Sequence, residues 1–383
     1  MYQSKSGKCR RTAALLLSAV LGIALMAGCA NAPLEVPDNN QKRTEIIVYN
    51  WGDYMDSENL AAFEDAYPQY EVVYREFESN ETMYPTLDNT YDIIIPSEYM
   101  IARLIREDKL QKLDKSLLPD VAKYMNPLFE QLQYTQDKDI SDQMLDYGIP
   151  YLYCTVGLVY DANRVELPEN TTSATDIWGV LFNPDNKNAI GMYDSMRESI
   201  GAALNYLGYS INTLDERELR EAEELLLMQK TLISPSFGID NLKDKLAAGE
   251  LAAAEAWSGD HLVILDRIEE LGKEEEIDLQ FALPVGSNWS VDMMAIPKNA
   301  KNVEGAHAFI NYMYNPDVAL SNCEYVGYST PNTAAFDKLP EDIRENVAYY
   351  PDDATFMTLE PYYSDAAIEE TYAAIWNTVK ASS

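Results

Sequence analysis

The stretch EIIVYNWGDYMDSENLAAFEDAYPQYEVVYREF, residues 45–77, decides the fold class of this 383-residue chain. Strand-forming aliphatic residues open it, a segment with an apolar helical face follows, and a second β-branched run closes it. The alternation continues through a short helical segment at 81–87, a strand at 91–97 and a helix at 98–110. Buried strands that alternate with amphipathic helices indicate a parallel, doubly wound sheet with right-handed crossovers. We therefore expect an α/β fold.

The loop after the first strand is the first candidate for function. Ser57 is the expected N-cap of the first helix, so residues 51–56 lie between the end of a strand and the start of a helix. Ligands bind at this edge of open α/β sheets, and we expect Trp51, Asp53 and Tyr54 to face one. Taken alone, the two aromatics fit a hydrophobic core better, and the acid fits a helix terminus.

A long extended stretch, YGIPYLYCTVGLVYDANRV at residues 147–165, contains no turn signal that would end one domain cleanly. We interpret it as a crossover from a first lobe into a second lobe, whose residues again carry several helical patterns. Trp178 and Trp376 are expected in the core of that second part. His261 and His307 are expected on helix surfaces.

The first thirty residues are typical of a secretory signal with a lipoprotein-type cleavage site. An apolar run at 13–27, short for a spanning helix, ends in LMAGC at Cys29 and follows four basic residues: Lys5, Lys8, Arg10 and Arg11. We expect residues 1–28 to be the signal peptide, Cys29 to carry lipid and 29–44 to form a flexible tether. The protein would then be extracytoplasmic and lipid-anchored to the cell membrane, on the periplasmic face if an outer membrane is present. An uncleaved anchor is the alternative.

Composition narrows the function classes. The chain carries 63 acidic and 29 basic residues, a net charge of −34, which repels nucleic acid and attracts cations, although solubility alone also explains such a surface. Two histidines leave little for a histidine-rich metal site or a Ser-His-Asp triad. Nucleotide and hydrolase fingerprints are absent, and we expect neither a cofactor nor a metal. Whether Cys154 and Cys323 pair cannot be deduced.

A set of motifs, in order along nearly the whole mature chain, resembles the polyamine-binding proteins of spermidine/putrescine ABC uptake systems. The motifs are YNWGDY, ESNETMY, YDIIIPSEYM, LQKLDKS, GIPY, SATDIW, AWSGD, VDMMAIPKNAKN and VGYSTPN. The resemblance implies a two-lobed periplasmic-binding-protein fold of type II, with the ligand in the interlobe cleft. It implies a first lobe at 45–153, a second lobe at 154–290, a return segment of the first at 291–326, and C-terminal helices at 327–383 that complete the second.

The resemblance also implies the ligand-binding residues. They are Trp51, Asp53, Tyr54, Ser97, Tyr99, Glu198, Trp257, Asp260, Asp292 and Tyr328. Asp260 matches an acid found in the putrescine-type members, and Asp292 aligns with the central carboxylate.

Five further positions are candidates because the chain departs from the family pattern there. Gly52 stands where a serine or threonine usually follows the tryptophan. Ser195 stands where spermidine-type members tend to carry an aspartate, and Asp194 precedes it. Ser290, with Trp289 beside it, stands where relatives have an aromatic residue. These departures leave the choice between a diamine and a triamine open.

Polyamine chemistry fits these residue types independently. Ammonium groups at fixed intervals need carboxylates, and the methylenes between them need flat apolar walls. We therefore expect a monomeric receptor that captures spermidine or putrescine and delivers it to the membrane permease and ATPase subunits of an ABC importer. The alternatives are a solute-binding protein of the same fold for another cationic or metal ligand, and a secreted glycoside hydrolase with Asp260 and Asp292 as its two acids.

Overall fold

The structure, a computed structural model, describes residues 43–363 and 365–382. The expected signal peptide, the lipid attachment site Cys29 and most of the expected tether lie outside the described residues. Nine strands are present in this part of the chain: β1 (Thr44–Trp51), β2 (Tyr70–Phe77), β3 (Ile93–Ile94), β4 (Gly148–Asp161), β5 (Ile190–Tyr193), β6 (Ser236–Gly238), β7 (Ala253–Trp257), β8 (Leu279–Ala282) and β9 (Trp289–Ala295).

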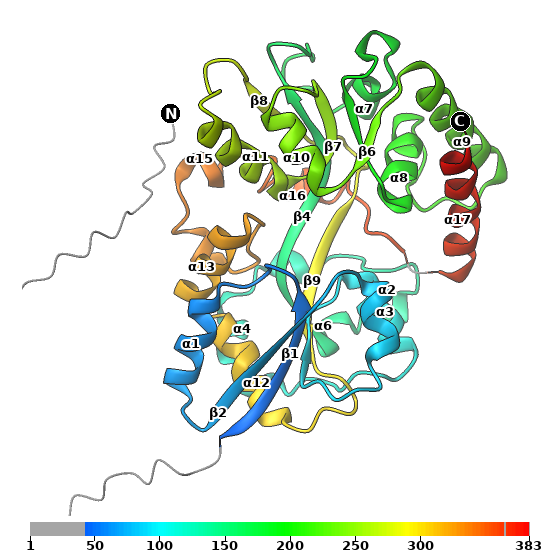
Figure 1. Ribbon diagram of the computed structural model, residues 1–383. Helices are drawn as coiled ribbons and strands as arrows, with labels where there is room; N and C mark the ends of the chain where they lie inside the picture. Colours follow the sequence, from blue (N-terminus) through cyan, green and yellow to red (C-terminus); the bar gives the residue numbers. More distant parts are fainter. Residues whose placement is uncertain (1–42, 364, 383) are drawn as a thin grey trace, which may run out of the picture. The chain divides into compact units, whose positions relative to one another are not determined.

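The strands form two sheets that share β4 (Figure 1). In the first sheet the order is β2-β1-β3-β9-β4, and in the second it is β4-β7-β5-β6, with β8 also paired to β4. β1 is parallel to β2 and β3, and β5 is parallel to β6 and β7, as expected. The sheets are not parallel throughout, because β9 runs antiparallel to both β3 and β4 when the chain returns to the first sheet.

Helices pack around each sheet. Around the first sheet lie α1 (Ser57–Ala66), α2 (Asn80–Met83), α3 (Glu98–Arg106), α4 (Pro119–Tyr124), α5 (Lys138–Ser141), α6 (Met144–Tyr147), α12 (Val303–Met313), α13 (Pro316–Val326), α14 (Thr333–Phe336), α15 (Glu341–Arg344) and α16 (Asp353–Phe356). Around the second lie α7 (Ala174–Phe182), α8 (Met196–Tyr206), α9 (Glu216–Leu232), α10 (Asp240–Ala247), α11 (Ser258–Leu271) and α17 (Ala366–Ala381). Short 3-10 helices are η1 (Tyr84–Thr86), η2 (Lys115–Leu117), η3 (Pro127–Glu130) and η4 (Pro184–Asn186). Within the described residues, no helix combines the length and apolarity needed to span a bilayer.

Each sheet is buried on both faces. Successive residues of β1 point to opposite sides, so that Val48 packs with α1 and α12 while Tyr49 packs with α3. In β4, Leu158 packs with α7 and α8, and Val159 packs with α10 and α11. This explains the near-continuous apolar runs of these strands, since a strand covered on both faces has no solvent side. Trp178, at 1% exposure, lies in the core as predicted.

The C-terminal segment divides between the two cores. α17 packs on the second sheet through Ile368 and Tyr372. Leu339 and Phe356, in contrast, lie in cores of the first sheet. Residues 327–383 therefore do not all complete the second lobe, because Leu339, Phe356 and Leu359 are buried in cores of the first. The exact boundaries between lobes stay a prediction.

Three local expectations need correction. Asp56, not Ser57, is the N-cap of α1, and its carboxylate accepts from the backbone N–H of Glu58 at 2.9 Å. His261 is buried against the hydroxyl of Tyr349, 2.6 Å from Nδ1, rather than on a surface. His307 is also buried, and its Nε2 accepts from a backbone N–H of the loop before η2. Both imidazole rings form hydrogen bonds within the protein in place of hydrogen bonds to water, as buried polar groups generally do.

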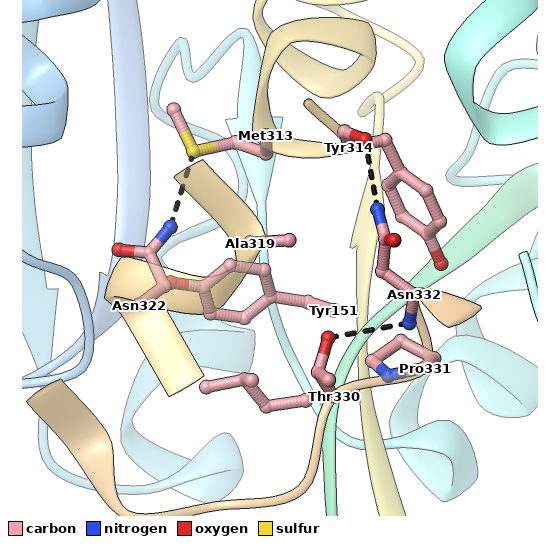
Figure 2. A pocket seen from close by; sticks show the side chains of 9 residues that line it. Tyr151, Met313, Tyr314, Ala319, Asn322, Thr330, Pro331 and Asn332 are labelled. Carbon is pink, nitrogen blue, oxygen red and sulfur yellow. Dashed lines mark hydrogen bonds between the residues drawn. The ribbon is translucent and has the colours of Figure 1, made fainter. Parts of the chain in front are cut away.

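The segment that contains Ser329 also pairs with β4, near the junction of the two sheets. Tyr153 and Ser329 exchange two backbone hydrogen bonds of 3.0 Å. A small pocket beside this pairing is lined by α12, α13 and the segment around Asn332 (Figure 2). Its two amides already donate, Asn332 to the carbonyl of Tyr314 and Asn322 to the sulfur of Met313. The pocket therefore offers close packing rather than free ligand groups.

Gly157 should be intolerant of a side chain, because a Cβ there would lie 2.5 Å from the carbonyl oxygen of Ala282 on β8. We expect Gly157→Ala to lower the free energy of unfolding by about 1–3 kcal/mol, measured by urea denaturation. Gly52→Ala is the matched control, since nothing lies within 4 Å of its Cβ position. Equal losses in the two variants would contradict the close approach of β4 and β8.

Candidate functional site

Asp292 of β9 is the centre of the candidate site. Its Oδ2 accepts a hydrogen bond of 2.7 Å from the Tyr54 hydroxyl, and its Oδ1 accepts one of 2.8 Å from Ser97 Oγ. Burial raises the pKa of this carboxyl from 3.8 to about 6, although these two hydrogen bonds and the indole of Trp51 act against the rise. Trp51 Nε1 is buried without a hydrogen-bond partner among the described groups. Three residues predicted from the first loop and the motif IIPSEYM thus meet at one acid.

A hydrogen-bonded chain extends from Ser97 towards α2. Asn80 donates to Ser97 Oγ at 3.2 Å and to the Tyr99 hydroxyl at 2.8 Å, and Tyr99 donates to Glu81 at 3.0 Å. Asn80 is 1% exposed, and its Oδ1 has no partner. Asn80 and Glu81 were not predicted from the sequence, although both lie in the motif ESNETMY, because only their contacts with Ser97 and Tyr99 link them to the site.

Glu98 lies behind Asp292 and is fully buried. Its Oε2 accepts from Ser290 Oγ and from the backbone N–H of Val291, both at 2.9 Å, while the other oxygen has no partner. Burial raises its pKa to about 8, so this carboxyl is neutral at pH 7. Ser290 was a candidate because it stands where relatives have an aromatic residue. Its hydroxyl donates to Glu98 instead.

The second sheet contributes Asp260, in the first turn of α11. Its carboxylate accepts from the Tyr193 hydroxyl at 2.5 Å and from Lys243 Nζ at 3.1 Å. The ring of Trp257 lies 4.6 Å from that of Tyr193. Neither Tyr193 nor Lys243 was singled out from the sequence, since each lies far from Asp260 along the chain.

Tyr328 joins the two halves of the site. Its ring meets that of Tyr54 edge to face, with centroids 5.6 Å apart. On the other side it lies directly on α11, where a Cβ on Gly259 would fall 2.0 Å from the ring. Both Asp260 and Asp292 are near enough to raise the pKa of Tyr328, although burial is the larger cause. Tyr328 therefore connects Tyr54 of the first lobe with α11 of the second.

Glu198, in the first turn of α8, accepts a hydrogen bond from Ser195 Oγ. Burial raises its pKa, and the nearby carboxylate of Glu81 from α2 adds to the rise. Asp194 was an alternative for the position of Ser195, but it is exposed and forms a 2.7 Å ion pair with Lys380 of α17. The alternative is wrong, because that ion pair holds Asp194 at the surface.

Three other candidates lie apart from this arrangement. Trp289 is 2% exposed and packs against Tyr134 and Phe356 in the core of the first sheet, so its proposed place at the ligand is wrong. Asp53 is exposed, with a left-handed φ of 51°. Gly52 beside it is exposed too.

The site has an excess of negative charge. After burial itself, Asp292, Asp260 and Glu198 contribute to raising the pKa of the buried Cys154 thiol, as does Glu98 when it is ionised. Within residues 43–363 and 365–382, no lysine or arginine forms an ion pair with Asp292 or Glu198. Acids from both lobes, flanked by aromatic rings, can hold an organic cation. The described residues include no group of three or more histidine, cysteine or acidic side chains placed to hold a metal ion.

The chain has two α/β lobes that share strand β4, and both lobes contribute acids and aromatic residues at their junction. These features define a two-lobed solute-binding protein of type II. A family model described as bacterial extracellular solute-binding protein matches residues 58–352, and the chain belongs to this family. It is a family of solute-binding proteins rather than of enzymes.

The chain is 30% identical to a putrescine-binding periplasmic protein of Pseudomonas aeruginosa, with 93% of this chain and 96% of the relative covered. It is 32% identical to the spermidine/putrescine-binding periplasmic protein of Escherichia coli, over 96% of this chain and 97% of the relative. A solved structure of a spermidine/putrescine ABC transporter substrate-binding protein from Streptococcus pneumoniae is 36% identical and has a TM-score of 0.74, covering 88% of this chain and 98% of that one.

Asp292→Asn should stabilise the empty protein. Between pH 3.8 and about 6 the folded state keeps a proton that the unfolded chain has lost, so the free energy of unfolding falls as pH rises through this window. We expect the free energy of unfolding of the variant to exceed that of the original protein by about 1–3 kcal/mol at pH 7. Near pH 4 the two values should be almost equal. Urea denaturation across this range tests it. Asp194→Asn should show no such gain, because Asp194 is exposed. If Asp292→Asn changed the free energy of unfolding by the same amount at every pH, the raised pKa of Asp292 would be refuted.

Proposed function

We propose that this protein captures a polyamine such as putrescine or spermidine outside the cytoplasm and delivers it to an ABC importer. The observation that carries the proposal is the group of acids from both lobes, of which Asp292 and Glu198 form no ion pair with a lysine or arginine among the described residues. The relatives support it, since they are a putrescine-binding protein and a spermidine/putrescine-binding protein.

The expected contacts follow from the geometry of the site. Ammonium groups of the ligand would bind Asp292 and Glu198, which are desolvated acids and therefore strong partners for a cation. Tyr54, Tyr328 and Trp257 would line the methylenes. One cation over an aromatic ring contributes roughly 0.5–2 kcal/mol, so micromolar affinity, about −8 kcal/mol, needs several such contacts together with the carboxylates.

Partners and location follow from the same proposal. The receptor would be monomeric, would dock on the permease of an importer driven by ATPase subunits, and would stay at the membrane through lipid on Cys29. The sequence pattern around that cysteine supports the anchor. We propose no catalysis, because the glycoside-hydrolase alternative also needs a second carboxylate free to attack the sugar or to activate water, whereas Asp260 is held by Lys243 and Tyr193.

Calorimetric titration of the chain from residue 30 onward tests the proposal. Putrescine, spermidine and spermine should be compared with an uncharged sugar, and we expect saturable one-to-one binding of at least one amine only. Asp292→Asn should weaken that binding by a factor of about 100 or more, because it removes a buried charge from the ligand's partner. Asp194→Asn is the matched control and should bind normally, since Asp194 lies outside the site. Binding of the sugar, or of no amine, would refute the proposal.

Amine binding should weaken at acid pH. With its pKa near 6, Asp292 is largely protonated at pH 5, and an ammonium ligand must expel that proton. The amines stay charged throughout, since their pKa values lie near that of lysine, about 10. We expect the dissociation constant to rise roughly tenfold from pH 7 to pH 5, with most of the rise below pH 6, and to change little above pH 7. Titrations in buffers of different ionisation enthalpy should show proton release near pH 6, and constant affinity from pH 5 to 7 would contradict it.

A further inference from the structure

Lys243 of α10 occupies the cation position of one acid in the site. Its Nζ lies 3.1 Å from Asp260 Oδ1 and 2.9 Å from Asp240 Oδ1. The side chain of Asp260 is 6% exposed and that of Lys243 14%, whereas that of Asp240 is 87% exposed. The exposed pair contributes little, so the buried partner of Lys243 is Asp260.

This ion pair leaves Lys243 charged. Burial on its own lowers the pKa of the ammonium, but the attraction of Asp260 and the hydrogen bonds to both acids outweigh it, and the pKa is raised. Asp260 is held from a second direction by the Tyr193 hydroxyl, which itself accepts from the backbone N–H of Trp257 at 2.9 Å. A ligand ammonium that reached Asp260 would have to leave the Lys243 ammonium partly buried and unpaired, which is costly.

The Asp260 end adjoins the rest of the site through Tyr328. That ring rests on Gly259, next to Asp260, and meets Tyr54, which donates to Asp292. On the far side of Asp292, the chain through Ser97, Asn80 and Tyr99 leads to Glu81, whose carboxylate is near that of Glu198. Contacts thus link Asp260 to Asp292 through Tyr328, and Asp292 to the surroundings of Glu198 through Glu81. Of these three acids, only Asp260 carries a salt bridge within the described part of the chain.

We propose that Lys243 is a specificity-determining residue that fills the cation position at Asp260 and confines the bound amine to the part of the site between Asp292 and Glu198. This inference rests on the proposed function. With that end closed, two of the three acids, Asp292 and Glu198, are left without a salt bridge, which suits a diamine. A third ammonium gains no carboxylate at the Asp260 end, so a triamine such as spermidine has no advantage over putrescine there.

The experiment compares putrescine and spermidine in calorimetric titrations of Lys243→Met and of the original protein. Removing the ammonium should open the Asp260 end, and we expect the ratio of the two dissociation constants to shift towards spermidine by about tenfold or more, the size of one charge-assisted hydrogen bond. Lys245→Met is the matched control. It removes a charge from the same helix, but Lys245 donates to Ser236 and does not contact Asp260, so the ratio should stay unchanged.

Two further variants keep the inference falsifiable. Lys243→Gln should give a shift in the same direction if Lys243→Met folds poorly, with thermal unfolding as the check of folding. Adding Asp260→Asn to Lys243→Met should return the ratio to its original value, because the gain depends on that carboxylate. An unchanged ratio in both Lys243 variants, or a shift that survives Asp260→Asn, overturns the inference while amine binding itself stands. Failure of the original protein to bind any amine refutes the proposed function and the inference with it.

Discussion

Strand β4 makes two sets of hydrogen bonds, with β9 in one sheet and with β7 and β8 in the other, and the rest of the structure depends on this sharing. Each lobe buries its own core against its own end of the strand. Backbone pairing along β4 therefore joins the two lobes. Asp292 lies on β9, opposite Leu152 of β4. The central acid is thus placed by the same pairing that joins the lobes.

The acids of the site oppose stability and favour binding. A desolvated carboxylate without a cation costs free energy, and Asp292, Glu198 and Glu98 all have raised pKa values because of burial. The protein tolerates this cost because neutral donors, Tyr54, Ser97 and Ser195, hydrogen-bond the carboxylates without neutralising them. Such donors hold the oxygens in place and leave the charge for a cation. At Asp260 a lysine supplies that charge instead, which makes the two ends of the site chemically different.

The sequence predicted the strand–helix alternation of the first lobe well, since apolar periodicity records burial directly. β2 occupies residues 70–77 as expected. It predicted the wrong place for Trp289 and for both histidines, because a large aromatic or an imidazole shows no local sign of whether it is buried. The N-cap moved by one residue, from Ser57 to Asp56, since adjacent residues both had a suitable oxygen.

By itself the sequence determined the residue types at the junction: an aromatic loop at the end of β1, acids at the starts of α8 and α11, and an acid within β9. The order of the motifs along the chain predicted these residue types, because each motif places its side chain at a fixed position relative to the end of a strand or helix. Only the tertiary structure decided which acids keep a free charge. That depends on contacts between residues distant in sequence, such as Lys243 with Asp260 and Asp194 with Lys380, and the Coulomb interaction acts through space rather than along the chain.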